Sequence, residues 1–174
     1  DDSEAYAIFQ AWKRLDTGLT ANIGIAIPSR RPIEQMSLSS SYGMRVHPIT
    51  GKLARHNGVD IPAPYGTPIY ATADGIVGRA QRLGGYGNYV EIEHGNAIET
   101  RYGHMSSFVV RPGQQVKKGD VIGYVGSTGR STGNHLHYEV RIDGEPVNPM
   151  PFVRSDSMTI AALTGDKLAM GGPE

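Results

Sequence analysis

Two histidines spaced one residue apart are the residues of this chain best suited to chemistry. His135 and His137 lie in the segment GNHLHYEVRI, in which apolar and charged residues alternate from 138 to 142. This alternation is typical of a β-strand. Side chains at i and i+2 of a strand point to the same face, so the two imidazoles lie side by side, roughly 7 Å apart at their Cα atoms. Such a pair can be a metal site, an acid–base pair or a chance arrangement.

A second pair of potential ligands, His56 and Asp60, lies in the segment RHNGVDIP. Gly58 and Pro62 argue against a helix here, so we expect a loop that leads into a strand. Together the two pairs offer histidine and carboxylate ligands, and three protein ligands with one open position are typical of catalytic zinc. A zinc ion held in this way can acidify a water and polarise a carbonyl group. The spacing alone does not say which histidine of the HxH pair binds the metal.

The remaining histidines have weaker patterns. His104 ends a strand-like run in RYGHMS, where it is either a partly exposed strand end or an acid–base group, since imidazole titrates near neutrality. His47 follows Arg45 in GMRVHP, a loop that either lines a cleft or only turns before the next proline. We expect His94 to be structural or solvent-exposed. The chain has no HExxH helix, so in a zinc hydrolase the proton transfers would fall to histidines.

Glycine and proline punctuate the whole chain, with 23 and 11 occurrences in 174 residues. Short strand-like runs recur about every ten residues from 67 to 142, which predicts an all-β fold, an antiparallel sandwich or barrel. Apolar residues at helical spacing over 3–15 predict a short N-terminal helix. We therefore expect a helix and arm over 1–40, one domain over 41–152 and a tail over 153–174.

Charge and cysteine content narrow the classes of function. The formal net charge is zero, so we expect no nucleic-acid partner. The chain has no cysteine, so any metal must be held by histidine, aspartate or glutamate. No segment reaches transmembrane length. No signal peptide is visible at Asp1, and we expect that an export signal has been removed.

Residues 41–152 resemble the lysostaphin-type (LytM-like) zinc metallopeptidases, which cut peptides of peptidoglycan. The resemblance rests on SYGMRVHPITG, HNGVDIPAPYGTPIYATADGIV, GGYGNYVEIEHG, the segment from TRYGHM to HLHYEVR, and GEPVNP. It implies a two-layer antiparallel β-sandwich of the duplicated-hybrid-motif type.

The same resemblance implies roles for particular residues. By it, His56, Asp60 and His137 would bind one zinc ion per chain, while His104 and His135 would be the catalytic histidines that orient water and stabilise the oxyanion. Further candidates for a substrate groove are Tyr86 and Asn88, which the resemblance places in a lining loop, together with Arg45 and His47.

We therefore predict a zinc metalloendopeptidase that hydrolyses peptide bonds in peptidoglycan stem peptides or cross-bridges during cell-wall remodelling. The alternative is a non-catalytic peptidoglycan-binding or amidase-activating domain of the same fold, which the five intact site positions disfavour. The predicted location is extracytoplasmic. The lack of a separate wall-binding module favours the bacterial periplasm, and secretion is the alternative.

Overall fold

The computed structural model describes residues 26–35, 43–46 and 53–153, and only the backbone of 43–46, 53–56 and 151. The predicted helix over 3–15, the predicted tail and His47 lie outside these residues. The described strands are β1 Gly43–Val46, β2 Leu53–His56, β3 Val59–Pro62, β4 Pro68–Tyr70, β5 Gly75–Arg82, β6 Asn88–Glu93, β7 Ile98–Phe108, β8 Gln115–Val116, β9 Val121–Val125, β10 His135–Ile142 and β11 Glu145–Val147. The helical pieces are the 3-10 turn η1 Gly84–Tyr86 and the short helix α2 Met150–Val153.

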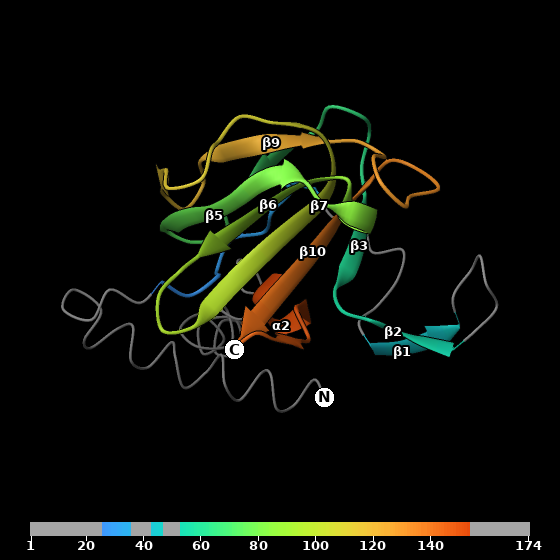
Figure 1. Cartoon of the computed structure of the whole chain (residues 1–174), viewed down its shortest axis with the longest axis horizontal. Coiled ribbons are helices and arrows are strands. Elements are labelled where there is room, and N and C mark those ends of the chain that lie inside the picture. Colours follow the sequence, from blue (N-terminus) through green and yellow to red (C-terminus); the bar gives the residue numbers. More distant parts are fainter. Residues whose placement is uncertain (1–25, 36–42, 47–52, 154–174) are drawn as a thin grey trace, which may run out of the picture.

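Nine of these strands form one antiparallel sheet in the order β11-β10-β7-β6-β5-β8, with β3 paired to β10 and β4 paired to β9. One layer is the row of strands from β11 to β8, and the other contains the β4–β9 pair. The long strand β7 joins them, because it pairs with β10 and β6 along most of its length and with β9 at Met105–Phe108. Figure 1 shows β9 lying above β5 and β6, with the β1–β2 pair off to one side. The predicted all-β antiparallel fold is confirmed.

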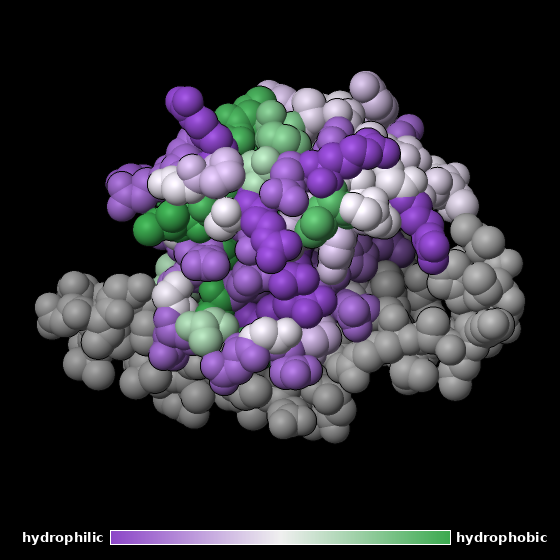
Figure 2. All heavy atoms as spheres, viewed as in Figure 1, coloured by the Kyte–Doolittle hydropathy of each residue, from purple (hydrophilic) through white to green (hydrophobic). Residues whose placement is uncertain are grey.

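The core lies between these layers. It includes Val59, Ile61, Ile69, Ile122 and Leu136, none of which has measurable exposure. Burial of such side chains is the main source of stability, roughly 1.5–3 kcal/mol each. On the face shown in Figure 2, apolar residues form small separate patches among polar ones, and the large apolar side chains that are exposed among the described residues are Tyr65, Ile76 and Val109.

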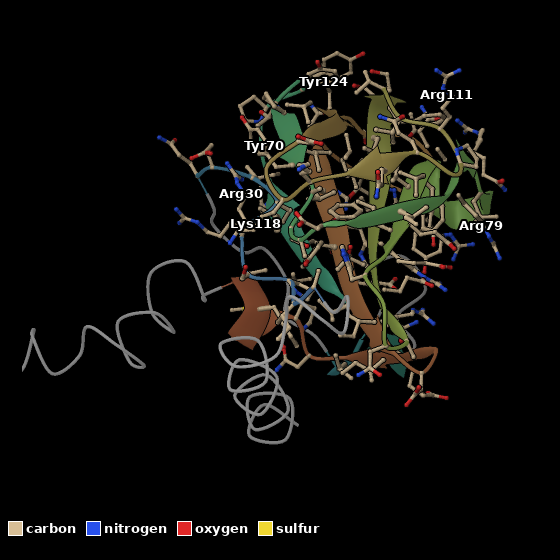
Figure 3. The ribbon with its side chains drawn as sticks, turned by 90° about the vertical axis from the view of Figure 1, so that its left-hand side faces the viewer. Arg30, Tyr70, Arg79, Arg111, Lys118 and Tyr124 are labelled. Atoms are coloured by element: carbon tan, nitrogen blue, oxygen red, sulfur yellow. The ribbon has the colours of Figure 1, made fainter. Side chains whose placement is uncertain are left out.

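Part of the predicted N-terminal arm contributes to this core. Ile27 and Ile33 are buried in the same cluster. The backbone N–H of Tyr70 donates to the carbonyl of Pro32 at 2.8 Å. The guanidinium of Arg30 lies 4.0 Å from the centre of the Tyr70 ring, a cation–π contact that Figure 3 places on one side of the molecule. Residues 26–35 are thus packed against the domain through both side-chain and backbone contacts.

A chain of buried polar groups runs through the core and ends at His94, which is only 2% exposed. His94 Nδ1–H donates to the carbonyl of Asp74 at 2.7 Å, so in the neutral ring Nε2 accepts from the Thr100 hydroxyl, also at 2.7 Å. The Thr100 hydroxyl in turn contacts Tyr102 Oη at 2.9 Å. Tyr102 Oη then contacts Thr72 Oγ1 at 3.1 Å, and Thr72 Oγ1 contacts Tyr138 Oη at 2.9 Å. His94 is therefore structural, one of the two predicted alternatives.

Burial of His94 makes an acid-sensitive contribution to stability. Desolvation lowers its pKa from 6.5 to about 4 in the folded chain, against weaker opposing effects of Asp74. Between these values the unfolded chain binds the extra proton, so the free energy of unfolding falls as pH drops from 6.5 to 4. We expect the loss to approach about 3 kcal/mol, measured by urea unfolding at a series of pH values.

The variant His94→Gln removes this titration, and it should be less stable at pH 7 but have a flatter pH dependence. All other titratable groups are the same in both proteins, so their contribution cancels in the difference. Equal slopes in the two proteins between pH 6.5 and 4 would contradict the assignment.

Candidate active site

The site is built on the face of β10 that points away from the core. Leu136, Tyr138 and Val140 are fully buried in the core, so the alternation turns the intervening side chains to the opposite face. These intervening residues are His135, His137, Glu139 and Arg141. In the paired strands, His137 lies opposite Asp60 of β3 on one side and Gly103 of β7 on the other.

This register brings Asp60 against both histidines of the HxH pair. Its Oδ1 lies 3.0 Å from His137 Nδ1 and 3.6 Å from His135 Nε2. Ligand atoms around a tetrahedral zinc ion, at 2.0–2.2 Å from the metal, are about 3.3 Å apart, so the separation of Asp60 Oδ1 and His137 Nδ1 is compatible with two ligands of one ion. His56, the other predicted ligand, ends β2 four residues before Asp60, and its side chain lies outside the described atoms.

The second ring nitrogen of His137 meets a buried carboxylate. Nε2 lies 2.7 Å from Glu139 Oε2, which also accepts from the Tyr86 hydroxyl at 2.8 Å. Glu139 Oε1 accepts from Arg141 Nε at 2.8 Å. His137 is therefore held between two carboxylates, one at each nitrogen.

The charges around His137 favour a cation. Burial by itself lowers the pKa of His137, but hydrogen bonds and charge attraction from Asp60 and Glu139 outweigh it and raise the pKa to about 9. For Glu139 the directions are reversed. Burial raises the pKa of this carboxyl, but the interactions with His137, Tyr86 and Arg141 outweigh burial and lower the pKa to about 2. Zinc binds imidazole nitrogen and carboxylate oxygen, and His137 Nδ1 and Asp60 Oδ1 offer one of each at 3.0 Å from one another, so the donor set fits zinc.

His104 lies beside the pair on β7, and the backbone around it is unusual. Its φ of 62° is uncommon for a residue other than glycine, and such strain clusters at functional sites. The ring centre lies 4.7 Å from that of His135 and 6.0 Å from that of His137. His104 Nδ1–H donates to the Thr128 carbonyl at 2.7 Å. Burial lowers the pKa of His104 to about 4, so the ring is neutral at pH 7 and its Nε2 can accept a proton.

Two loops fix the Thr128 carbonyl that holds His104. The Arg130 N–H donates to the Gly85 carbonyl at 2.9 Å, and the Asn88 N–H donates to Thr128 Oγ1 at 3.0 Å. Gly87 and Gly129 allow this approach, since a Cβ on either would lie 2.4 Å from backbone of the other loop. We call the segments 83–88 and 126–131 the loop pair. Both glycines also have positive φ, which glycine adopts without strain.

Residues 54–149 match a known family, described as peptidase family M23. The chain belongs to this family. It is 53% identical over 119 residues to the DD-carboxypeptidase/endopeptidase Mpg of Neisseria meningitidis, a match covering 68% of this chain and 27% of that protein. The chain thus spans well under half the length of this curated relative.

Two solved structures have the same fold as this M23 domain. A zinc-containing peptidase from Vibrio cholerae is 40% identical with a TM-score of 0.67, over 71% of this chain and 39% of that one. The catalytic domain of the antimicrobial peptidase lysostaphin from Staphylococcus simulans is 32% identical with a TM-score of 0.63, over 69% of this chain and 93% of that one. The resemblance seen in the sequence is confirmed.

The M23 domain brings together Asp60, His104, His135 and His137 from three strands. Two of the predicted groove residues, Tyr86 and Asn88, have described side chains. Tyr86 is half-buried with its hydroxyl on Glu139, and Asn88 Nδ2 donates to the Ser106 carbonyl at 3.0 Å, which ties the loop pair to β7. Arg45 lies in β1, where only the backbone is described.

Sequence reasoning missed Glu139 and Thr128 as parts of the site. The strand alternation that paired the two histidines also puts Glu139 on their face, so a signal for it was present. Nothing in the local sequence indicates that the Thr128 carbonyl meets His104, because the contact joins residues 24 apart through the loop pair.

A second set of carboxylates lies at the other end of β6 and β7. The side-chain oxygens of Glu91, Glu93 and Glu99 come within 4.8 Å of one another. Glu91 pairs with Arg79 and accepts from the Tyr89 hydroxyl, and Glu99 pairs with Arg101. Two of the three carboxylates thus have an arginine partner.

The tight contact between the two loops predicts that Gly129→Ala lowers the free energy of unfolding. The new Cβ would meet Gly87 N at 2.4 Å, so the loops must separate. We compare it with Gly113→Ala, because Gly113 also has positive φ (85°) but nothing within 4 Å of its Cβ position. Backbone strain alone should lower the free energy of unfolding by about 1 kcal/mol in Gly113→Ala, and Gly129→Ala should lose clearly more in urea unfolding. Equal losses would show that the loops do not depend on this contact.

Proposed function

We propose that this chain is a zinc endopeptidase domain that hydrolyses peptide bonds in peptidoglycan. The observation that carries the proposal is the approach of Asp60 Oδ1 to His137 Nδ1 and His135 Nε2, at 3.0 and 3.6 Å, with a neutral His104 next to them. Membership of a peptidase family and similarity to a zinc-containing peptidase support the metal.

In this proposal Asp60 and His137 bind one zinc ion per chain, and His56 is the third ligand. When bound, zinc would lower the pKa of a water molecule and polarise the carbonyl of the scissile bond. His135 remains outside the ligand set and is available for proton transfer, as the sequence resemblance implied.

Two histidines then handle the protons. The Thr128 carbonyl holds Nδ1–H of His104, and the Gly133 carbonyl accepts from Nδ1 of His135 at 2.9 Å, so each ring presents Nε2 for chemistry. One ring accepts a proton at Nε2 as water adds to the carbonyl carbon. The other donates a hydrogen bond from Nε2 to the developing oxyanion, which requires that this ring carries a proton on Nε2 as well as on Nδ1. The proton is then delivered to the leaving amine as the carbon–nitrogen bond breaks.

The names of the relatives support the proposed substrate. Mpg is named a DD-carboxypeptidase/endopeptidase, and a Vibrio cholerae protein 46% identical over 123 residues is named peptidoglycan DD-endopeptidase ShyA. These names favour cross-linked peptides as the substrate, with cleavage of a peptide bond that joins two D-configured centres. Peptidoglycan lies outside the cytoplasmic membrane, so we place the domain in an extracytoplasmic compartment, with the periplasm favoured. Among the described residues, no helix has the length and apolar content needed to cross a membrane.

Metal analysis tests the ligand assignment. The purified chain should contain close to one zinc ion, which Asp60→Ala should remove, because the carboxylate is shared by the proposed centre. His135→Ala should keep the metal and lose activity. If His135→Ala strips the metal while His137→Ala retains it, the assignment of the two histidines is wrong.

Product analysis tests the reaction. Zinc-loaded protein incubated with defined cross-linked peptidoglycan should release cleaved peptides that mass spectrometry identifies, and a chelator should abolish their release. The matched control is Glu145→Gln, an exposed change on β11 that should leave cleavage unchanged. Zinc-loaded protein that binds peptidoglycan but releases no cleaved peptide would instead support a binding or regulatory domain.

A further inference from the structure

Glu139 is a buried carboxylate that contacts the metal-ligand candidate His137. Its side chain is 1% exposed, and both of its oxygens accept hydrogen bonds. Oε2 lies 2.7 Å from His137 Nε2 and 2.8 Å from the Tyr86 hydroxyl, while Oε1 lies 2.8 Å from Arg141 Nε. Three groups therefore fix the position and orientation of this carboxylate. A buried carboxylate without such partners would be strongly destabilising.

The contact with His137 determines which ring nitrogen faces the metal position. When Nε2 carries its proton toward Glu139, the lone pair of the neutral ring lies on Nδ1, 3.0 Å from Asp60 Oδ1. Histidine ligands of zinc commonly donate their other N–H to a carboxylate, which fixes the tautomer and the ring orientation.

Tyr86 is locked in place on the other side of the carboxylate. Its ring centre lies 4.7 Å from that of Tyr89 and 5.8 Å from that of His137. Gly103 makes room for it, because a Cβ there would lie 3.1 Å from Tyr86 Cδ1 and 3.6 Å from His137 Cβ. The tyrosine is therefore packed between β6 and β10 with its hydroxyl directed at Glu139.

We propose that Glu139 is the positioning residue for His137, and that Tyr86 acts on the metal site through Glu139 rather than as a substrate-groove residue. The inference rests on the proposed zinc site. It also gives the loop pair a second role, since segment 83–88 carries Tyr86 and segment 126–131 carries the carbonyl that holds His104. The same loops then orient a metal ligand and a proton-transfer histidine.

The test is a double-mutant cycle on zinc affinity, measured by competition with a chromogenic chelator. Glu139→Gln should weaken zinc binding about 10- to 100-fold, and Tyr86→Phe should weaken it by a smaller factor. Because Tyr86 acts only through Glu139, adding Tyr86→Phe to Glu139→Gln should cause no further loss. The control variants Glu145→Gln and Tyr65→Phe, both at exposed positions, should bind zinc as the unaltered chain does.

A second readout separates positioning from a general loss of structure. Cobalt in place of zinc gives a visible absorption spectrum that depends on ligand geometry, and both site variants should alter it while their metal-free melting stays cooperative. If Glu139→Gln fails to fold, Tyr86→Phe alone decides the question. Unchanged zinc affinity and an unchanged cobalt spectrum in Tyr86→Phe, with hydrolysis lost, would overturn the proposal and return Tyr86 to the groove.

These outcomes are distinguishable from failure of the proposed function. Zinc affinity is measured without substrate, so a chain that binds zinc through this network but cleaves no peptidoglycan would refute only the peptidase. Cleavage by the unaltered chain, together with zinc affinity unchanged in Glu139→Gln, would refute only the positioning role. A chain that binds no zinc would overturn both.

Discussion

The pairing of β10 between β3 and β7 is the constraint on which the site depends. It sets His137 directly opposite Asp60 on one neighbour and Gly103 on the other. A slip of one residue would turn every side chain of β10 to the opposite face, so the core residues Leu136, Tyr138 and Val140 enforce the register that the chemistry requires. Hydrophobic burial on one face of the strand thus fixes charge placement on the other.

The two faces of this strand hold different kinds of buried polar groups. On the core face, Tyr138 ends a chain of hydroxyl groups that leads to a neutral His94. On the site face, His137 lies between two carboxylates that favour a positive charge. Neutral groups linked by hydrogen bonds suit the interior of a sheet, whereas an imidazole held between carboxylates suits a position that exchanges a proton for a metal ion.

The loop pair connects these elements, because two glycines let segments 83–88 and 126–131 approach more closely than any other residue type would allow. One segment supplies Tyr86, which reaches Glu139, and the other supplies the Thr128 carbonyl, which holds His104. His104, which this carbonyl holds, also has the uncommon φ of 62°. The loop pair therefore reaches histidines on two different strands, directly at His104 and through Tyr86 and Glu139 at His137.

The sequence by itself determined the features that depend on local periodicity. Alternation predicted the strand at 135–142 and a shared face for His135 and His137, glycine and proline spacing predicted an antiparallel β fold, and family resemblance supplied roles for the ligands. Tertiary structure decided what depends on contacts between distant segments. The 3.0 Å approach of Asp60 to His137, the carbonyl of Thr128 on His104 and the packing of Ile27 and Ile33 into the core all join residues far apart in the chain. Such contacts depend on strand register and on how closely the loops approach each other. Neither of these produces a periodic pattern in the sequence of the residues involved.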